Sequence, residues 1–125
     1  MPMKILLAIF TSFLLLGCTN NSTPAQLVNI PLAAKPAIPN TEKECTDAKA
    51  YWVEQGIPGG GKSCAIKTKD SRKICTEDLQ CEGSCLVASS TKVGSPAIGS
   101  CSDWVATYGC YNFIQDGLVR GICTD

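Results

Sequence analysis

The most informative absence in this sequence is histidine, which occurs at none of its 125 positions. Without an imidazole, the chain cannot form the Ser-His or Cys-His pairs that activate most catalytic nucleophiles. Its carboxylates offer no substitute, because residues such as Asp103 and Asp116 show no convergent spacing for acid–base catalysis. We therefore do not expect an enzyme, and we expect no cofactor.

An excess of one charge is also missing, since eleven Lys and Arg residues balance eleven Asp and Glu residues. Proteins that bind nucleic acid need surplus basic side chains to neutralise phosphates, so we expect no nucleic-acid partner. One basic segment carries four cationic side chains around Asp70, namely Lys67, Lys69, Arg72 and Lys73. We interpret it as a solvated loop, and the alternative is a patch for phosphate or anionic lipid.

The chain also lacks an apolar run long enough to cross a bilayer as a helix, which takes about 20 residues. Its apolar segment over residues 5–16 has twelve residues, of which two are Thr and Ser. The segment follows a short basic start over residues 1–4, which is the layout of a secretory signal peptide. We interpret it as an export signal.

Residues 15–18 (Leu-Leu-Gly-Cys) end this segment and resemble the lipobox of bacterial lipoproteins. In that family the cysteine sulfur receives a diacylglycerol, the peptide bond before it is cleaved, and the new amino terminus takes an acyl chain such as palmitate. The resemblance implies a signal peptide over residues 1–17 and a membrane anchor on Cys18. Thr19, at the sorting position, implies the outer membrane, facing the periplasm or the cell surface. The alternative is an ordinary secretory signal with an incidental cysteine.

Residues 18–41 carry the lipid and lead to the domain. They are rich in Asn, Thr, Pro and Ala and show no sustained apolar periodicity. Their prolines are Pro24, Pro31, Pro36 and Pro39. This composition predicts a flexible linker.

Cysteine is the residue that the chain has in excess, with nine copies. Assigning Cys18 to lipid leaves eight, an even number that predicts a disulfide framework in an exported domain. They are Cys45, Cys64, Cys75, Cys81, Cys85, Cys101, Cys110 and Cys123. The predicted domain, residues 42–125, needs such bridges because a chain of this size buries only about 60% of its unfolded surface.

The start of the domain predicts a helix. Thr41 and Glu44 have the spacing of a capping box. Cys45, Ala48 and Trp52 then recur on one helical face, and Gly56 followed by a proline ends the pattern. We expect a helix from residue 42 to about residue 55.

Residues 56–63 satisfy the P-loop pattern letter by letter (Gly-Ile-Pro-Gly-Gly-Gly-Lys-Ser). A working P-loop follows a buried strand and opens a helix whose amino terminus faces the phosphates. Here a predicted helix precedes the pattern and a short alternating segment, residues 64–68, follows it. We therefore expect a glycine-rich loop and no nucleotide.

The cysteines at 75, 81 and 85 enclose a tight turn at residues 82–84. Zinc is the rival interpretation of this spacing, but the chain has no histidine, and oxidised sulfurs cannot bind metal as thiolates. We expect no metal. Residues 89–100, rich in Ser and Gly, predict a surface loop.

The carboxyl-terminal segment predicts a β-hairpin. Strand-like runs over residues 108–115 and 118–123 flank Asp116 and Gly117, which suit a two-residue type I′ turn. That turn places Cys110 opposite Cys123 in a non-hydrogen-bonded pair, with Cα atoms about 4.5 Å apart, within disulfide range. We predict this bridge.

The other six domain cysteines allow fifteen pairings, and spacing alone does not choose among them. We favour Cys45–Cys64, which ties the helix to the following strand. With it we favour Cys75–Cys85 and Cys81–Cys101. The expected fold class is a small disulfide-rich α+β domain, with one amino-terminal helix and short antiparallel strands that end in the hairpin.

Several features of the domain together resemble a class of short cysteine-rich exported bacterial proteins of uncharacterised activity. The residues that carry the resemblance are Trp52, Gly56, Cys64, the run 75–85, Cys101, Gly109, Cys110, Gly117 and residues 123–125. The run 75–85 is also similar to half of a whey-acidic-protein inhibitor repeat, but the adjacent cysteine pair of that family is absent. The first resemblance implies architecture only.

A rigid disulfide scaffold favours a binding or inhibitory module, with a protein or other ligand as partner. Trp104, Tyr108, Tyr111 and Phe113 are the candidate anchors, although any of them could instead fill the core. The alternative function is a structural or stress-related envelope lipoprotein with no discrete ligand.

Overall fold

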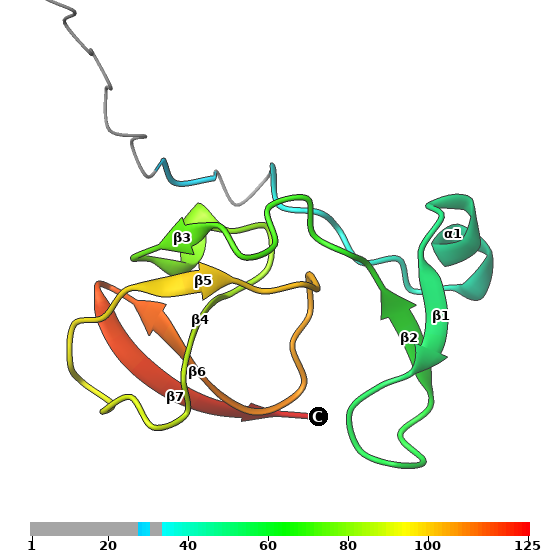
Figure 1. Ribbon diagram of the computed structural model, residues 1–125. Helices are drawn as coiled ribbons and strands as arrows, with labels where there is room; N and C mark the ends of the chain where they lie inside the picture. The colour runs from blue at the N-terminus through cyan, green and yellow to red at the C-terminus, as the bar shows by residue number, and fades with distance from the viewer. Residues whose placement is uncertain (1–27, 31–33) are drawn as a thin grey trace, which may run out of the picture.

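The computed structural model describes residues 28–30 and 34–125. Figure 1 shows two units side by side, a helix with a two-stranded sheet and a five-stranded sheet. The first unit consists of α1 (Glu42–Asp47), β1 (Tyr51–Glu54) and β2 (Lys62–Ala65). None of the helices in the described part of the chain has the length and apolar character that crossing a bilayer requires.

The second unit is an antiparallel sheet with strand order β3-β5-β4-β6-β7. Its strands are β3 (Ile74–Cys75), β4 (Cys85–Val87), β5 (Gly99–Cys101), β6 (Gly109–Gln115) and β7 (Leu118–Thr124). A 3-10 turn, η2 (Asp78–Gln80), packs beside β4. The expected class is confirmed: a small disulfide-rich domain of antiparallel strands, with one short α-helix and a carboxyl-terminal hairpin.

Helix α1 begins where the capping box predicts but ends early. The Thr41 hydroxyl accepts a hydrogen bond from the Glu44 amide at 3.3 Å. The prediction of a helix to about residue 55 is wrong, because Lys49 turns the chain with a φ of 56° and β1 follows. The Tyr-Trp-Val sequence of β1 has aromatic and β-branched side chains that favour a strand, and this preference outweighs the helical spacing of the apolar residues.

The β1–β2 hairpin has two unlike faces. Trp52 lies opposite Cys64 in the register, and a disulfide joins Cys64 to Cys45 of α1. Because side chains alternate along a strand, Tyr51 and Val53 lie on the face away from α1. Figure 1 shows that this unit stands beside the five-stranded sheet, with β2 closer to it than β1.

The carboxyl-terminal hairpin has the predicted turn and register. Asp116 and Gly117 have φ values of 53° and 72°, as a type I′ turn requires. Gln115 pairs with Leu118 beside the turn, and Cys110 pairs with Cys123 farther along. The Cα atoms of those cysteines are 4.0 Å apart, and a disulfide joins their sulfurs.

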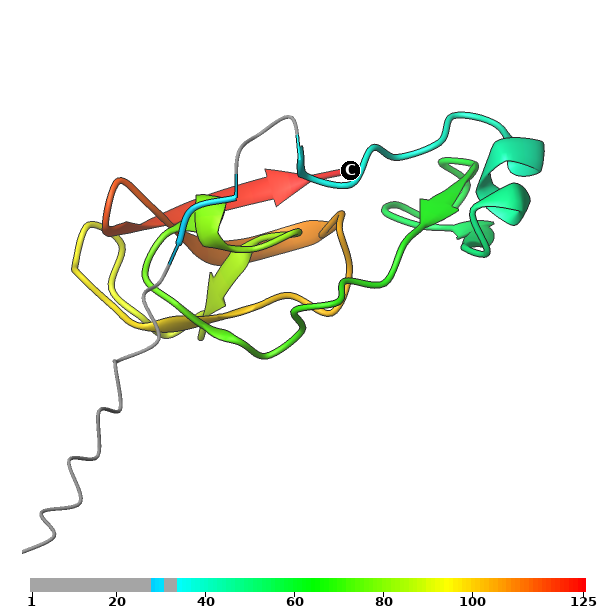
Figure 2. The same cartoon turned by 90° about the horizontal axis from the view of Figure 1, so that it is seen from above.

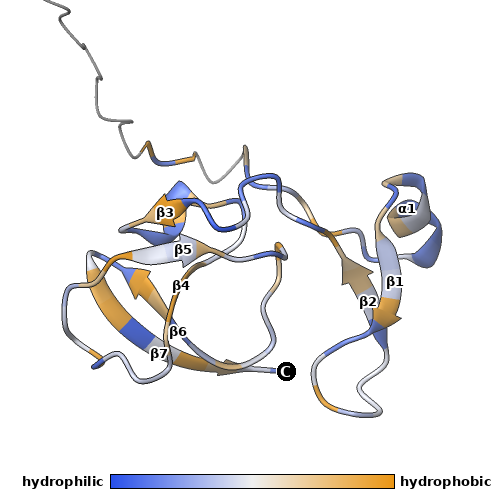
Figure 3. Ribbon diagram, in the orientation of Figure 1, coloured by the Kyte–Doolittle hydropathy of each residue, from blue (hydrophilic) through white to orange (hydrophobic). Residues whose placement is uncertain are grey.

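Sulfur forms much of the core of the five-stranded unit. Its four central cysteines are at most 2% exposed and lie beside the buried Ile114. The bonds are Cys75–Cys85 and Cys81–Cys101, so all four disulfides are the pairs that we favoured. Figure 3 shows hydrophobic residues along the strands and a largely hydrophilic α1, which fits a domain with little apolar interior.

The loop between β4 and β5 is shorter than expected. Gly99 and Ser100 were predicted to lie in the loop, but they form the start of β5. Their hydrogen-bonded pairing with β3 and β4 outweighs the loop-like composition of the sequence. The loop itself is held down, because the Asn112 side chain donates to the carbonyls of Ser89 and Thr91 at 3.2 Å.

Part of the segment expected to be a linker lies against the domain. The Lys35 ammonium donates to the carbonyls of Asp78 and Gly83, at 3.2 and 3.1 Å. The Ile30 amide donates to the Leu79 carbonyl at 2.6 Å. In Figure 2 the chain then crosses from the five-stranded sheet to α1. The predicted signal peptide and lipid site lie outside the described residues.

Candidate binding groove

A hollow between the two units is lined mainly by aromatic and aliphatic side chains. It has a volume of about 580 Å³ and lies between the β1–β2 hairpin and the loop 102–108, which leads from β5 to β6. We name it the aromatic groove, defined by Tyr51, Val53, Ala65, Leu86, Trp104, Ala106 and Tyr108.

The hairpin supplies one wall of the groove through the face that is turned away from α1. Tyr51 and Val53 come from β1, and Ala65 lies opposite Tyr51 on β2. The other face of the hairpin is fixed to α1 by the Cys45–Cys64 disulfide. The wall is therefore a rigid surface, although Tyr51 is half exposed.

The loop 102–108 supplies the other wall, and main-chain bonds fasten it to the end of β2. The Val105 amide donates to the Ile66 carbonyl at 2.9 Å. Lys67 and Trp104 form an isolated antiparallel β-bridge next to it. Because the backbone makes these contacts, the position of Trp104 relative to Tyr51 is fixed by the main chain.

Two large aromatic rings meet at one end of the groove. The rings of Tyr51 and Trp104 are 6.0 Å apart and meet edge to face at 80°. The Lys67 ammonium lies 5.9 Å from the first ring centroid and 5.5 Å from the second, in cation–π range. The residues Tyr51 and Trp104 are nevertheless 52% and 37% exposed, so much of their surface stays open to solvent.

Polar groups hold the opposite end of the groove. The Tyr108 hydroxyl lies 3.3 Å from the Ser63 hydroxyl, and the Gln55 side-chain amide donates to the same Ser63 oxygen at 2.8 Å. This chain of hydrogen bonds links the two walls. The Tyr108 hydroxyl is thereby held at this end of the groove.

The four aromatic residues that we predicted as anchors lie in two separate places in the structure. Trp104 and Tyr108 line the aromatic groove. Tyr111 and Phe113 pack together on β6, with ring centroids 6.0 Å apart, and both are half-buried. Tyr111 lines a separate hollow of about 280 Å³ beside the Cys110–Cys123 bridge. The structure therefore brings together only two of the four.

Sequence reasoning missed Tyr51 and Val53. The reason is the incorrect helix, because a helix over this segment does not place the two residues on one face as a strand does. The signal that finds them is the run of aromatic and β-branched residues Tyr51, Trp52 and Val53, which favours a strand.

The P-loop-like segment 56–63 forms most of the connection between β1 and β2. A strand follows it where a P-loop needs a helix. The Gly59 amide donates to the Glu54 carboxylate at 2.6 Å, so this amide is already bonded within the chain. The segment therefore acts as a hairpin loop, with positive φ at Gly56, Gly59 and Gly61.

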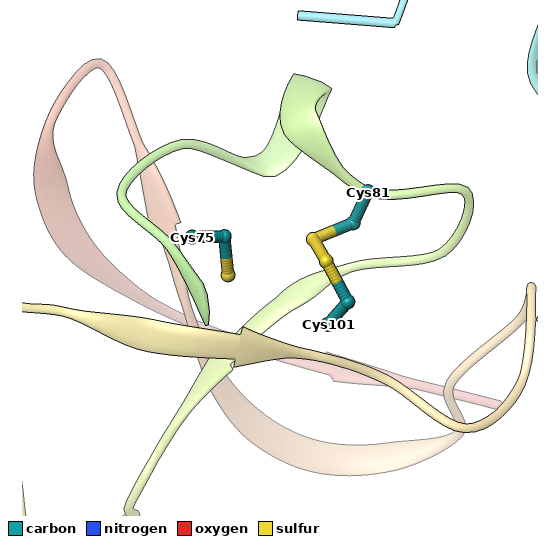
Figure 4. A group of neighbouring side chains, drawn as sticks. All are labelled: Cys75, Cys81 and Cys101. Carbon is teal, nitrogen blue, oxygen red and sulfur yellow. A yellow bond between two sulfur atoms is a disulfide. The ribbon is translucent and has the colours of Figure 1, made fainter. Parts of the chain in front are cut away.

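Three sulfur atoms converge in the core, as Figure 4 shows. The sulfurs of Cys75, Cys81 and Cys101 lie within 4.8 Å of one another, a grouping that could suit a metal ion. Each is bound in a disulfide, Cys81 to Cys101 and Cys75 to Cys85, and a disulfide sulfur is not a thiolate ligand. The cluster is a structural core in this oxidised form.

The two carboxylates considered for acid–base chemistry lie on different elements. Asp103 lines the aromatic groove and accepts a hydrogen bond from the Ser71 hydroxyl. Asp116 forms the turn between β6 and β7. The arrangement thus leaves Asp103 as the acidic group at the groove.

The fold and the groove define a class: a small domain held by four disulfides, with exposed aromatic side chains on a preformed hollow. A scan against protein-family models found no match, and searches of curated proteins and of solved structures found none either.

Proposed function

We propose that this chain is a lipid-anchored protein of the cell envelope that acts as a binding or inhibitory module, with the aromatic groove as its binding site. The lipobox-like residues 15–18 support the anchor, and the four disulfides support an oxidising compartment outside the cytoplasm. In this proposal the protein carries no catalytic centre, no metal and no nucleotide.

The exposure of Tyr51 and Trp104 carries the proposal. A domain with so small an apolar core would gain stability by burying both rings, yet they are 52% and 37% exposed on the walls of a hollow of about 580 Å³. Tyr and Trp are enriched among the residues that dominate binding energy. Because the walls are already fixed, a ligand loses little free energy in ordering them.

The test is ligand capture by matched variants of the protein purified from membranes of the producing cell. We expect the wild-type protein to retain one stoichiometric partner from an envelope extract and the Trp104→Ala variant to lose at least tenfold in affinity, as hot-spot residues do. The control is Ile98→Ala, because Ile98 is 73% exposed in the β4–β5 loop and does not line the groove. Equal retention by both variants would refute the groove as the site.

If the wild-type protein captures no partner, and deletion of the gene makes the envelope permeable, the results would favour the alternative function, a structural or stress-related lipoprotein.

The anchor is tested separately by intact-mass measurement. We expect Cys18 to carry a diacylglycerol and an amino-terminal acyl chain, and the Cys18→Ser variant to lose both. A wild-type Cys18 without lipid would refute the anchor.

A further inference from the structure

Two smaller hollows share lining residues with the aromatic groove, one at each of its ends. One, of about 320 Å³, shares Asp103 and Trp104 with it, and the other, of about 260 Å³, shares Gln55 and Tyr108. We name the three hollows together the trough; the residues that line it include members of the stretch from Lys62, the first residue of β2, to Lys67. At about 3.3 Å per residue, an extended chain of about six residues spans this length.

The end of the trough beside Trp104 is positively charged. Lys67 and Arg72 line it, and neither forms an ion pair with any carboxylate in the described part of the chain. The carboxylate that lies there, Asp103, accepts a hydrogen bond from Ser71. Two cationic side chains therefore lie next to an apolar groove. A complementary ligand has an apolar group for the groove and, beside it, an acidic group for the two cations.

The centre of the trough offers few free hydrogen-bonding groups. Gln55, Ser63 and the Tyr108 hydroxyl are already linked to one another. Tyr51 and Trp104 meet edge to face, so the two rings do not form one coplanar surface. Apolar contact and charge, rather than a network of hydroxyl hydrogen bonds, therefore determine what fits.

We propose that the trough binds an extended acidic segment of a partner protein, an inference that rests on the proposed function. One large apolar side chain of the segment fills the aromatic groove, and an acidic side chain contacts Lys67 and Arg72. The far end of the trough has a mixed lining that includes Ile57, Lys62 and Asp125. It suits further peptide with both apolar and polar side chains.

The test is to select peptides from a display library of random hexapeptides. The target is the purified protein in its natural processed form. We expect the selected peptides to share a large apolar residue with an acidic residue at one side. Replacing that acidic residue by its amide should weaken binding to the wild-type protein about two- to fivefold, as expected for exposed charge pairs. The loss should shrink at high salt because the charges are exposed.

The variant Lys67→Gln/Arg72→Gln should bind the acidic peptide and its amide equally, whereas the control Lys92→Gln, in the β4–β5 loop, should keep the difference. Selected peptides without acidic preference, or no selection over background, would overturn the inference.

Titration with oleate and with a β-1,4-linked N-acetylglucosamine hexamer distinguishes failure of the peptide inference from failure of the proposed function. If either probe binds in a Trp104-dependent way and no peptide is selected, the groove is retained and the peptide is rejected. If neither binds and envelope capture is also independent of Trp104, the proposed function fails as well.

Discussion

At the scale of single residues, Gly83 shows how closely the five-stranded unit is packed. It is buried, and a Cβ at this position would overlap the Ser102 hydroxyl oxygen and the Trp104 carbonyl oxygen. The Ser102 hydroxyl is itself held, because it accepts from the Ser84 amide at 3.0 Å and donates to the Trp104 carbonyl at 2.7 Å. The absence of a side chain at Gly83 therefore helps to set the wall of the aromatic groove.

We predict that Gly83→Ala lowers the free energy of unfolding by about 2–3 kcal/mol, the upper range for overpacking, because backbone atoms must move. Urea denaturation measures the loss. The control is Gly121→Ala, where the nearest atom, the Asn112 side-chain oxygen, lies 3.1 Å away, so that only a small shift is needed. Equal losses in the two variants would contradict the close packing at Gly83.

At the scale of elements, the β6–β7 hairpin depends on the left-handed backbone of its turn. Asp116 has a φ of 53°, a region that costs most residues about 1–2 kcal/mol and that Asn and Asp tolerate better. We predict that Asp116→Ala destabilises the protein by about 1 kcal/mol and that Asp116→Asn leaves it unchanged. Thermal unfolding compares the two, and a destabilised Asn variant would point to the carboxylate charge instead of the backbone.

An element could be predicted from the sequence where its local signals agree with one another. The hairpin was predictable because its turn chemistry, alternation and cysteine positions all agree within residues 108–124. The β1 strand was not, because a genuine capping box at Thr41 precedes an apolar spacing that also suits a helix, and only Lys49 interrupts it. The groove was predictable only in part. The β-bridge between Lys67 and Trp104 brings the loop 102–108 to the β1–β2 hairpin. These two residues are almost 40 positions apart, so no local sequence pattern predicts the contact.

At the scale of the whole molecule, the disulfides have two different roles. Cys75 and Cys85 are fully buried, whereas Cys110 and Cys123 are exposed on the hairpin. The first pair stands ten residues apart in sequence and the second thirteen. Loops of these lengths give nearly the same chain-entropy stabilisation, about 3 kcal/mol each. Any larger difference between the bridges must therefore come from core packing.

We predict that Cys110→Ser/Cys123→Ser costs about 3 kcal/mol and leaves a folded protein, because the hairpin register is also fixed by its turn. Cys75→Ser/Cys85→Ser should cost at least 2 kcal/mol more, since it also buries two hydroxyls in place of sulfur beside Ile114. Urea denaturation at equal protein concentration compares the two double variants, and near-ultraviolet circular dichroism reports whether tertiary packing survives. Equal losses would mean that the buried bridges act only by restricting the unfolded chain. The sulfur core would then not be the packing element that orders the five-stranded unit and, through loop 102–108, the groove.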